Sequence, residues 1–261
     1  MTTAMAAATT TPTSRVLALA TTETRLILRN RTVAVSSVVL PVALGVFWGF
    51  QFGSGGDPAR QAVSITLQLA VALTMGLYLT ATQTLVSRRH TRVFKRMRTS
   101  GLSDRGLLAA TLTPSVVLAL FQLAVFAVVN LVTGTPQPTD PLPLVLAVLG
   151  GVALVVAAAL ATSVVTPSPE RAQITTLPLM FLMLGVGVVA SIAPAHGWWS
   201  VLMVVPGAAM GDLTQLAMTG GSWGVGAAGL PAILPSLVAL VVWPAVFGMF
   251  AARRFRWDPR H

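Results

Sequence analysis

Six long apolar runs constrain this chain more than any other feature of its sequence. They lie at residues 33–50, 62–86, 107–132, 142–165, 174–193 and 232–252. A helix of about 20 apolar residues crosses the ~30 Å hydrocarbon layer of a bilayer. Only 9% of the 261 residues are charged, whereas soluble domains carry roughly a quarter, so a soluble fold would lack polar surface. We therefore expect an all-α integral membrane protein with six transmembrane helices, one for each run.

Turn-rich segments separate the runs. QFGSGGDPAR (51–60) and TGTPQPTD (133–140) are typical of loops. In TPSPERAQ (166–173), Ser168 can cap a helix that begins at Pro169 and carries Glu170 in its first turn. The polar segment 1–14 lacks the charged start, apolar core and cleavage site of a signal peptide, and we expect it to be flexible.

The basic residues predict the orientation. If the runs cross the membrane in turn, sixteen of the 17 Lys and Arg residues flank them on one side, and Arg60 lies alone on the other. Lys and Arg concentrate on the cytoplasmic side of membrane proteins. We therefore expect both termini, with a basic tail at 253–261, in the cytoplasm of a cell whose plasma membrane holds the chain.

The segment 87–103, SRRHTRVFKRMRTSGLS, together with Arg105 holds seven of these cations. As a helix it places His90, Val93, Phe94 and Met97 in one apolar stripe among the cations. Two interpretations follow. Either the helix lies on anionic lipid headgroups, or its stripe docks in the groove of a cytoplasmic partner.

A second amphipathic helix is predicted just before the first run, as a cytoplasmic interfacial helix at 15–31. Over 15–29, one face carries polar residues and the opposite face carries apolar ones. The polar face holds Arg15, Thr22, Arg25 and Arg29, and the apolar face holds Val16, Leu19, Ala20 and Ile27. Glu23 falls on the apolar face, where it either pairs with an arginine of the basic loop or extends toward water.

The segment 195–230 has no Lys or Arg, and its one acid is Asp212. Its apolar pieces, WWSVLMVV and AAMGDLTQLAM, are too short to span a bilayer. We expect short half-inserted helices on the outer face, with Trp198, Trp199 and Trp223 at headgroup depth. An ordinary packed loop is the alternative.

The second run carries polar residues along one helical face. The face comprises Gln61, Ser64, Gln68, Met75, Leu79 and Thr82, with Gln83 beside it. Because amides are costly in lipid, this face should look into protein or a watery cavity. It is therefore either part of a substrate path or a site of hydrogen bonding between helices.

Enzymatic motifs are weak or missing. GGSWG (220–224) fits the serine-hydrolase pattern, but that elbow needs a strand, a turn and a helix, whereas Ser222 falls in a Gly-rich segment expected as an outer loop. The sequence contains neither Cys nor an H-E-x-x-H motif, so it offers no thiolate or zinc-protease site. Its single lysine, Lys95, follows Phe94 and not a P-loop glycine. We expect no catalytic residue, metal or nucleotide on this chain.

Several stretches together resemble the permease of the ABC transporter type-2 exporter family. ETRLILRNR, followed by a run with Pro41 near its start, is similar to the family's interfacial helix and first span. RVFKRMRTSGLS resembles its coupling helix, although Gly101 stands where a proline is usual and the acid near its start is absent. SPERAQITTLPLMFL and IAPAHGWWSVLMVVPGAAMGD resemble its fifth span and the short extracellular helices that follow.

The resemblance implies two permease chains, identical or paralogous, and separate ATP-binding subunits that hold the ATP and Mg²⁺. It assigns coupling to the ATPase to His90, Val93, Phe94, Lys95, Met97 and Arg98, and the interfacial helix to the stretch with Glu23, Arg25 and Arg29. It adds Thr175, Pro178 and Met183 to the candidate path of Gln61, Ser64, Gln68, Met75, Thr82 and Gln83. It places an extracellular gate at Trp198, Trp199, Pro206 and Asp212.

The expected function is therefore that of a permease subunit in an ATP-driven exporter. The mostly apolar candidate path suggests a hydrophobic or amphipathic substrate. A membrane-embedded signalling or assembly subunit without transport is the alternative, and an intramembrane hydrolase comes third. The ATPase gene beside this one, or its absence, would separate the first two.

Overall fold

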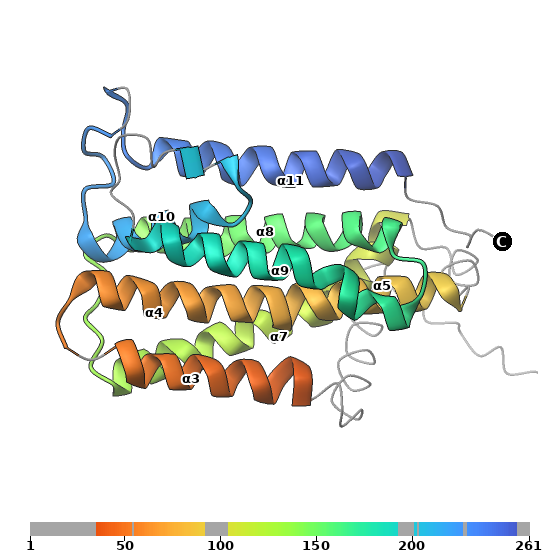
Figure 1. The fold of residues 1–261 in the computed structure, drawn as a ribbon, viewed down its shortest axis with the longest axis horizontal. Coiled ribbons are helices and arrows are strands. Elements are labelled where there is room, and N and C mark those ends of the chain that lie inside the picture. Colours follow the sequence, from red (N-terminus) through yellow and green to blue (C-terminus); the bar gives the residue numbers. More distant parts are fainter. Residues whose placement is uncertain are drawn as a thin grey trace, which may run out of the picture.

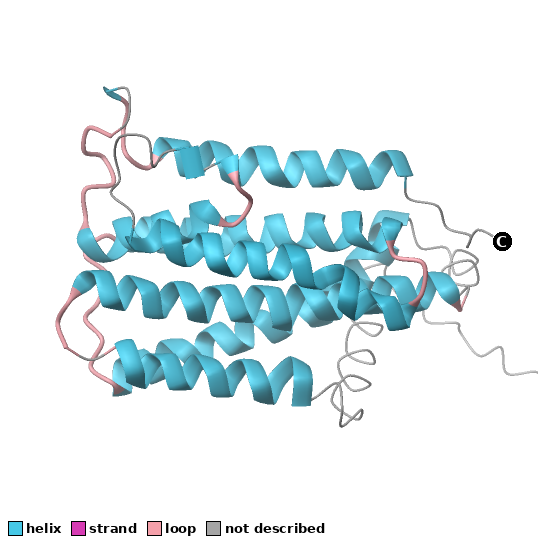
Figure 2. Cartoon of the chain, in the orientation of Figure 1, coloured by secondary structure: helices cyan, strands magenta, loops and turns pink. Residues whose placement is uncertain are grey.

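The computed structural model describes residues 35–53, 55–91, 104–192, 201–202, 204–226 and 229–254. Over these ranges the chain is helical, and extended pairing is limited to an isolated bridge between Val225 and Pro231 (Figure 2). The elements in chain order are η1 (Val35–Val39), α3 (Leu40–Phe52), α4 (Pro58–Val71), η2 (Ala72–Leu79), α5 (Thr80–His90), α7 (Asp104–Val132), α8 (Pro141–Val165), α9 (Pro169–Ile192), α10 (Ala208–Thr219) and α11 (Leu234–Arg254).

Five helices are long and apolar enough to cross a membrane. They are Pro58–His90, Gly106–Val132, Pro141–Val165, Pro169–Ile192 and Leu234–Arg254. The first apolar run forms a shorter helix, Ser37–Phe52. The chain is thus an all-α protein built for a bilayer, and a sixth span remains a prediction.

The helix Pro58–His90 is the centre of the bundle, and 78% of the residues in its most apolar stretch are buried. It contains α4, the π-helical segment η2 and α5 without a break. The helices α3 and α7 pack on one side of it, and α8, α9 and α10 pack on the other (Figure 1). The helix α11 lies outermost and packs mainly on α8.

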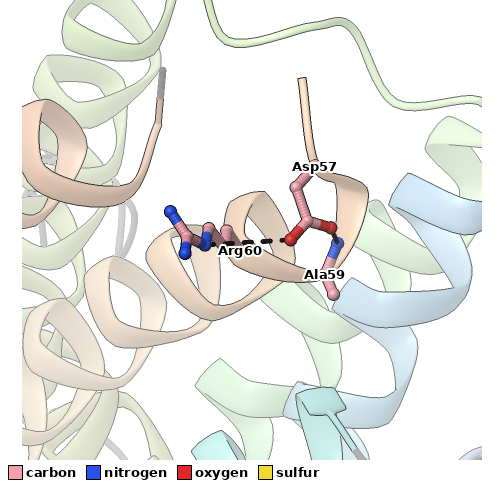
Figure 3. A network of polar contacts seen from close by, with 3 residues as sticks. All are labelled: Asp57, Ala59 and Arg60. Carbon is pink, nitrogen blue, oxygen red and sulfur yellow. Dashed lines mark hydrogen bonds and ion pairs between the residues drawn. The ribbon is translucent and has the colours of Figure 1, made fainter. Parts of the chain in front are cut away.

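A capped turn begins this central helix. The Asp57 carboxylate accepts a hydrogen bond from the Ala59 amide at 3.0 Å, and Pro58 occupies the first turn. Arg60 lies 3.8 Å from the same carboxylate (Figure 3). Both side chains of this ion pair are largely exposed, so it adds little stability, and the cap is what fixes the helix start.

Glycines allow close helix crossings at two points. The Phe126 ring of α7 packs against Gly45 of α3, where a larger residue would overlap with it. Gly211 of α10 lies directly against the Gly187 backbone carbonyl of α9, with no room for a side chain. In lipid, the hydrophobic effect does not hold helices together, so their association depends on close van der Waals packing. Small residues such as these glycines allow it, because they let the helix backbones approach each other.

The α9–α10 crossing can be tested with Gly211→Ala. The added methyl group would overlap a backbone carbonyl that cannot rotate away, so we expect the variant to lose about 1–3 kcal/mol of stability, as overpacked cores do. Gly185→Ala on α9 is the matched control, because no atom lies near the position of its methyl group. Thermal unfolding in detergent should show a lower Tm for the first variant only; equal Tm values would contradict the crossing.

Candidate functional site

The polar face of the central helix is turned into the chain's own helices. Ser64 Oγ donates to the Trp48 carbonyl of α3 at 3.1 Å. Gln68 Nε2 donates to the Gly45 carbonyl and to Asn130 Oδ1 of α7, both at 3.0 Å. Asn130 Nδ2 returns a bond to Gln68 Oε1 at 2.9 Å. For Ser64 and Gln68, these bonds fit the interpretation in which the polar face makes hydrogen bonds between helices.

Other members of that face have different surroundings. Gln61 Nε2 and Thr82 Oγ1 are buried and make no hydrogen bond to the described part of the chain. Met75 packs beside the cluster of Val71, Ala72 and Phe126. Gln83 is partly exposed. Buried polar atoms without protein partners usually bind water, so Gln61 and Thr82 are the positions on this face where polar groups from outside the chain could be accommodated.

The π-helical segment η2 was not anticipated from the sequence. It spans Ala72–Leu79, in the middle of the membrane helix. The Gln122 side-chain amide of α7 fills the space left by Gly76, and its Nε2 donates to the Ser37 carbonyl while its Oε1 lacks a hydrogen bond within the described chain. Such π segments occur often at functional sites, and Gly76 inside an apolar run is the only sequence signal for this one.

The three candidate residues on α9 do not share one environment. Thr175 Oγ1 donates to the Arg171 carbonyl at 3.0 Å within its own helix and is also hydrogen-bonded to Thr166 Oγ1, just after α8, at 2.9 Å. Pro178 is exposed, whereas Met183 is fully buried, against Gly207. From Ile174 onward the exposed face of α9 is otherwise apolar, and its large residues are Ile174, Leu177, Phe181, Leu182, Val189 and Ile192.

The short helix α10 is buried between α4, α8 and α9. Asp212 is 8% exposed and accepts a hydrogen bond from Ser236 Oγ of α11. Pro206 is buried just before α10. Trp223 is 68% exposed, while Trp198 and Trp199 lie outside the described residues. The extracellular gate therefore remains a prediction; of its four residues, Pro206 and Asp212 lie in the described part of the chain.

The end of the bundle opposite α10 is basic. Arg88, Arg89, Arg171, Arg253 and Arg254 lie there, where α5, α8 and α11 end and α9 begins (Figure 1). His90 is the exposed last residue of α5. The other predicted coupling residues (Val93, Phe94, Lys95, Met97 and Arg98) and the interfacial-helix residues (Glu23, Arg25 and Arg29) lie outside the described residues.

Ser222 corrects one expectation. The Gly-rich sequence around it predicts an outer loop open to solvent, but Ser222 is 2% exposed and its Oγ makes no hydrogen bond within the described chain. The neighbouring Ile233 amide donates to the Ser222 carbonyl at 3.1 Å, which folds the segment back onto the start of α11. Helix α10 and two glycines, and not a strand, precede Ser222, which lies in a turn. Among the described residues, no group of three metal-ligating side chains occurs.

Long apolar helices, an inward polar face and a basic end define a multi-pass helical membrane protein. The chain belongs to the ABC-2 family of transporter proteins, whose family model it matches over residues 14–253. It is therefore a membrane subunit of an ABC transporter, a class that works with a separate ATP-binding subunit and is not generally catalytic itself. No curated protein sequence matches the chain significantly.

The Gln68–Asn130 pair can be measured by a double-mutant cycle. Gln68→Leu and Asn130→Leu should each destabilise the bundle, because each removes the partner of an amide that is buried (Gln68) or partly buried (Asn130). Their coupling energy should be about 1 kcal/mol, within the range of interhelical bonds in membranes. Unfolding in mixed micelles measures the four variants. Gln68→Leu combined with Thr175→Val should be additive, because Thr175 bonds to Arg171, Ala172 and Thr166 and shares no partner with Gln68. Coupling near zero for the amide pair would show that it does not join α4 to α7.

Proposed function

We propose that this chain is the permease subunit of an ATP-driven exporter. The observation that carries the proposal is the family match over residues 14–253, nearly the whole chain. The chain's sequence contains no P-loop, so in this proposal a separate subunit binds ATP and Mg²⁺. Two permease chains, identical or paralogous, and two ATP-binding subunits form the transporter in the plasma membrane.

The basic end of the bundle faces the cytoplasm in this proposal. It is supported by the gathering of Arg88, Arg89, Arg171 and the Arg253–Arg254 pair at one end, because positive residues stay on the cytoplasmic side. The segment 92–103 connects α5 to α7 at that end and acts as the coupling helix. The interfacial helix at 15–31 lies on the same surface.

The substrate path runs beside α9 in this proposal. Ser64 and Gln68 are occupied by partners in α3 and α7. The α9 face with Pro178 and Phe181 is exposed and apolar in a single chain, so a second permease chain could cover it. Two permease chains that place these faces opposite each other would enclose an apolar passage. Such a lining suits a hydrophobic or amphipathic substrate, and α10 with Asp212 would close its outer end.

ATP drives transport only if it favours one conformation of the whole assembly over the other. In this proposal ATP closes the two ATP-binding subunits, and the coupling helices move with them. The permease then shifts toward an outward-open state. In this division of roles, the permease chain forms the passage and transmits the movement, and the ATP-binding subunit hydrolyses ATP.

The coupling segment offers the direct test of this function. Phe94→Asp places a charge on the predicted docking stripe, and burying it unpaired would cost several kcal/mol, enough to release the partner. We expect the variant to reach the membrane at the normal level but to lose the copurifying ATP-binding subunit. Replacing Arg92 and Arg96 with Gln is the control, because it removes cations and keeps the stripe. If the Arg92, Arg96 control loses the copurifying ATP-binding subunit while Phe94→Asp retains it, the cations matter more than the stripe, and the segment binds lipid headgroups instead.

A further inference from the structure

Arg88 connects the last turn of the central helix to α7. Its Nη1 donates to Thr111 Oγ1 at 3.2 Å, and the residue is only 8% exposed. Thr111 Oγ1 donates in turn to the Leu107 carbonyl at 2.8 Å, so the arginine joins a bond already made within α7. This acceptor is a neutral hydroxyl fixed on a helix.

Arg89 connects the same turn to α8. Its Nη1 donates to the Ser163 backbone carbonyl, in the last turn of α8, and its Nε is buried without a hydrogen bond to the described part of the chain. The last four carbonyls of a helix lack partners within it, and they form the negative end of the helix dipole. Arg89 therefore caps α8 from a neighbouring helix. The helices α5 and α8 end side by side, so one cation also offsets the repulsion between two negative helix ends.

The two arginines diverge because they are adjacent in a helix. Side chains at i and i+1 point about 100° apart and do not face each other. One guanidinium therefore reaches α7 and the other reaches α8, with α5 between them. Arginines that anchor a helix to headgroups extend toward water, whereas Arg88 is almost wholly buried and Arg89 half-buried. Burying guanidinium groups is costly, and the hydrogen bonds that offset this cost run to neighbouring helices.

We propose that Arg88 and Arg89 are positioning residues that form a clamp. The clamp makes the ends of α5, α7 and α8 that lie at the basic end of the bundle (their inner ends) move as one body. The clamp ends three residues before the segment 92–103 that follows α5. If that segment is displaced, the clamp would therefore transmit the movement to α5, α7 and α8 at the same time. The role in coupling rests on the function proposed above; the joining of the three helix ends does not.

The test measures the distance between the inner ends of α7 and α8. The chain has no Cys, so Ala109→Cys on α7 and Val165→Cys on α8, both at exposed positions, accept spin labels without background. Distances are recorded in lipid nanodiscs, first for the permease alone and then with its copurified ATP-binding subunit, with and without Mg-ATP and vanadate. The variant is the Arg88→Lys, Arg89→Lys double substitution, which keeps both charges but loses the reach and the planar fork of the donors.

We expect a narrow distance distribution in the native chain and a broadened one in the double Lys variant. The ATP-driven shift should be lost in the variant, although its partner still hydrolyses ATP and its membrane level is unchanged. Arg171→Lys, at an exposed position of α9, is the matched control and should behave like the native chain. Thr111→Val removes an acceptor of Arg88 and alters no charge, so it should also broaden the distribution. It provides an independent test if the double variant folds poorly.

This design distinguishes failure of the clamp from failure of the proposed function. Lys variants with a native distribution in the isolated permease would overturn the clamp, since preserved charge alone would then be sufficient. If the native permease retains no ATP-binding subunit, the proposed function fails, and the comparison of distributions in the permease alone still decides whether the clamp exists.

Discussion

The bundle depends on the burial of one long helix that carries polar side chains. In a bilayer, an amide cannot find water, so each one on Pro58–His90 must be satisfied by protein or by a buried solvent site. The reciprocal bonds between Gln68 and Asn130, and the bond from Gln68 to the Gly45 carbonyl, fulfil this condition. They fix α3 and α7 against one side of the central helix, and the remaining helices assemble on the other side.

The two ends of this bundle differ in chemistry. At one end, cations gather around the last turns of α5 and α11 and the first turn of α9. At the other end lies α10, a buried helix of 12 residues whose one acid bonds to a serine of α11. A strongly basic end suits docking of a cytoplasmic partner, and a compact end with a single described cation, Arg60, suits closure toward the outside. The function proposed here assigns each end that task.

Much of the helical layout could be predicted from the sequence, because apolar runs and turn residues are local signals. Each apolar run falls on a helix, and the helix predicted to begin at Pro169 begins there. The burial of Ser222 and the partners of Gln68 could not be predicted in this way. Gln68 and Asn130 are 62 residues apart, and one sequence does not reveal which distant polar groups meet. The π segment at Ala72–Leu79 also escaped, since helical periodicity assumes regular α-helix.

The orientation of the basic end is the claim on which the whole functional interpretation rests. It is tested by fusing a reporter that is active only in the cytoplasm at successive positions of the full chain in cells. Fusions after His261 and within the basic segment at Arg98 should be active, whereas those near Gly55, Pro138 and Gly220 should be inactive. Activity at Gly220 together with silence at Arg98 would place the basic end outside, where no ATP-binding subunit could reach it, and would contradict the proposed exporter.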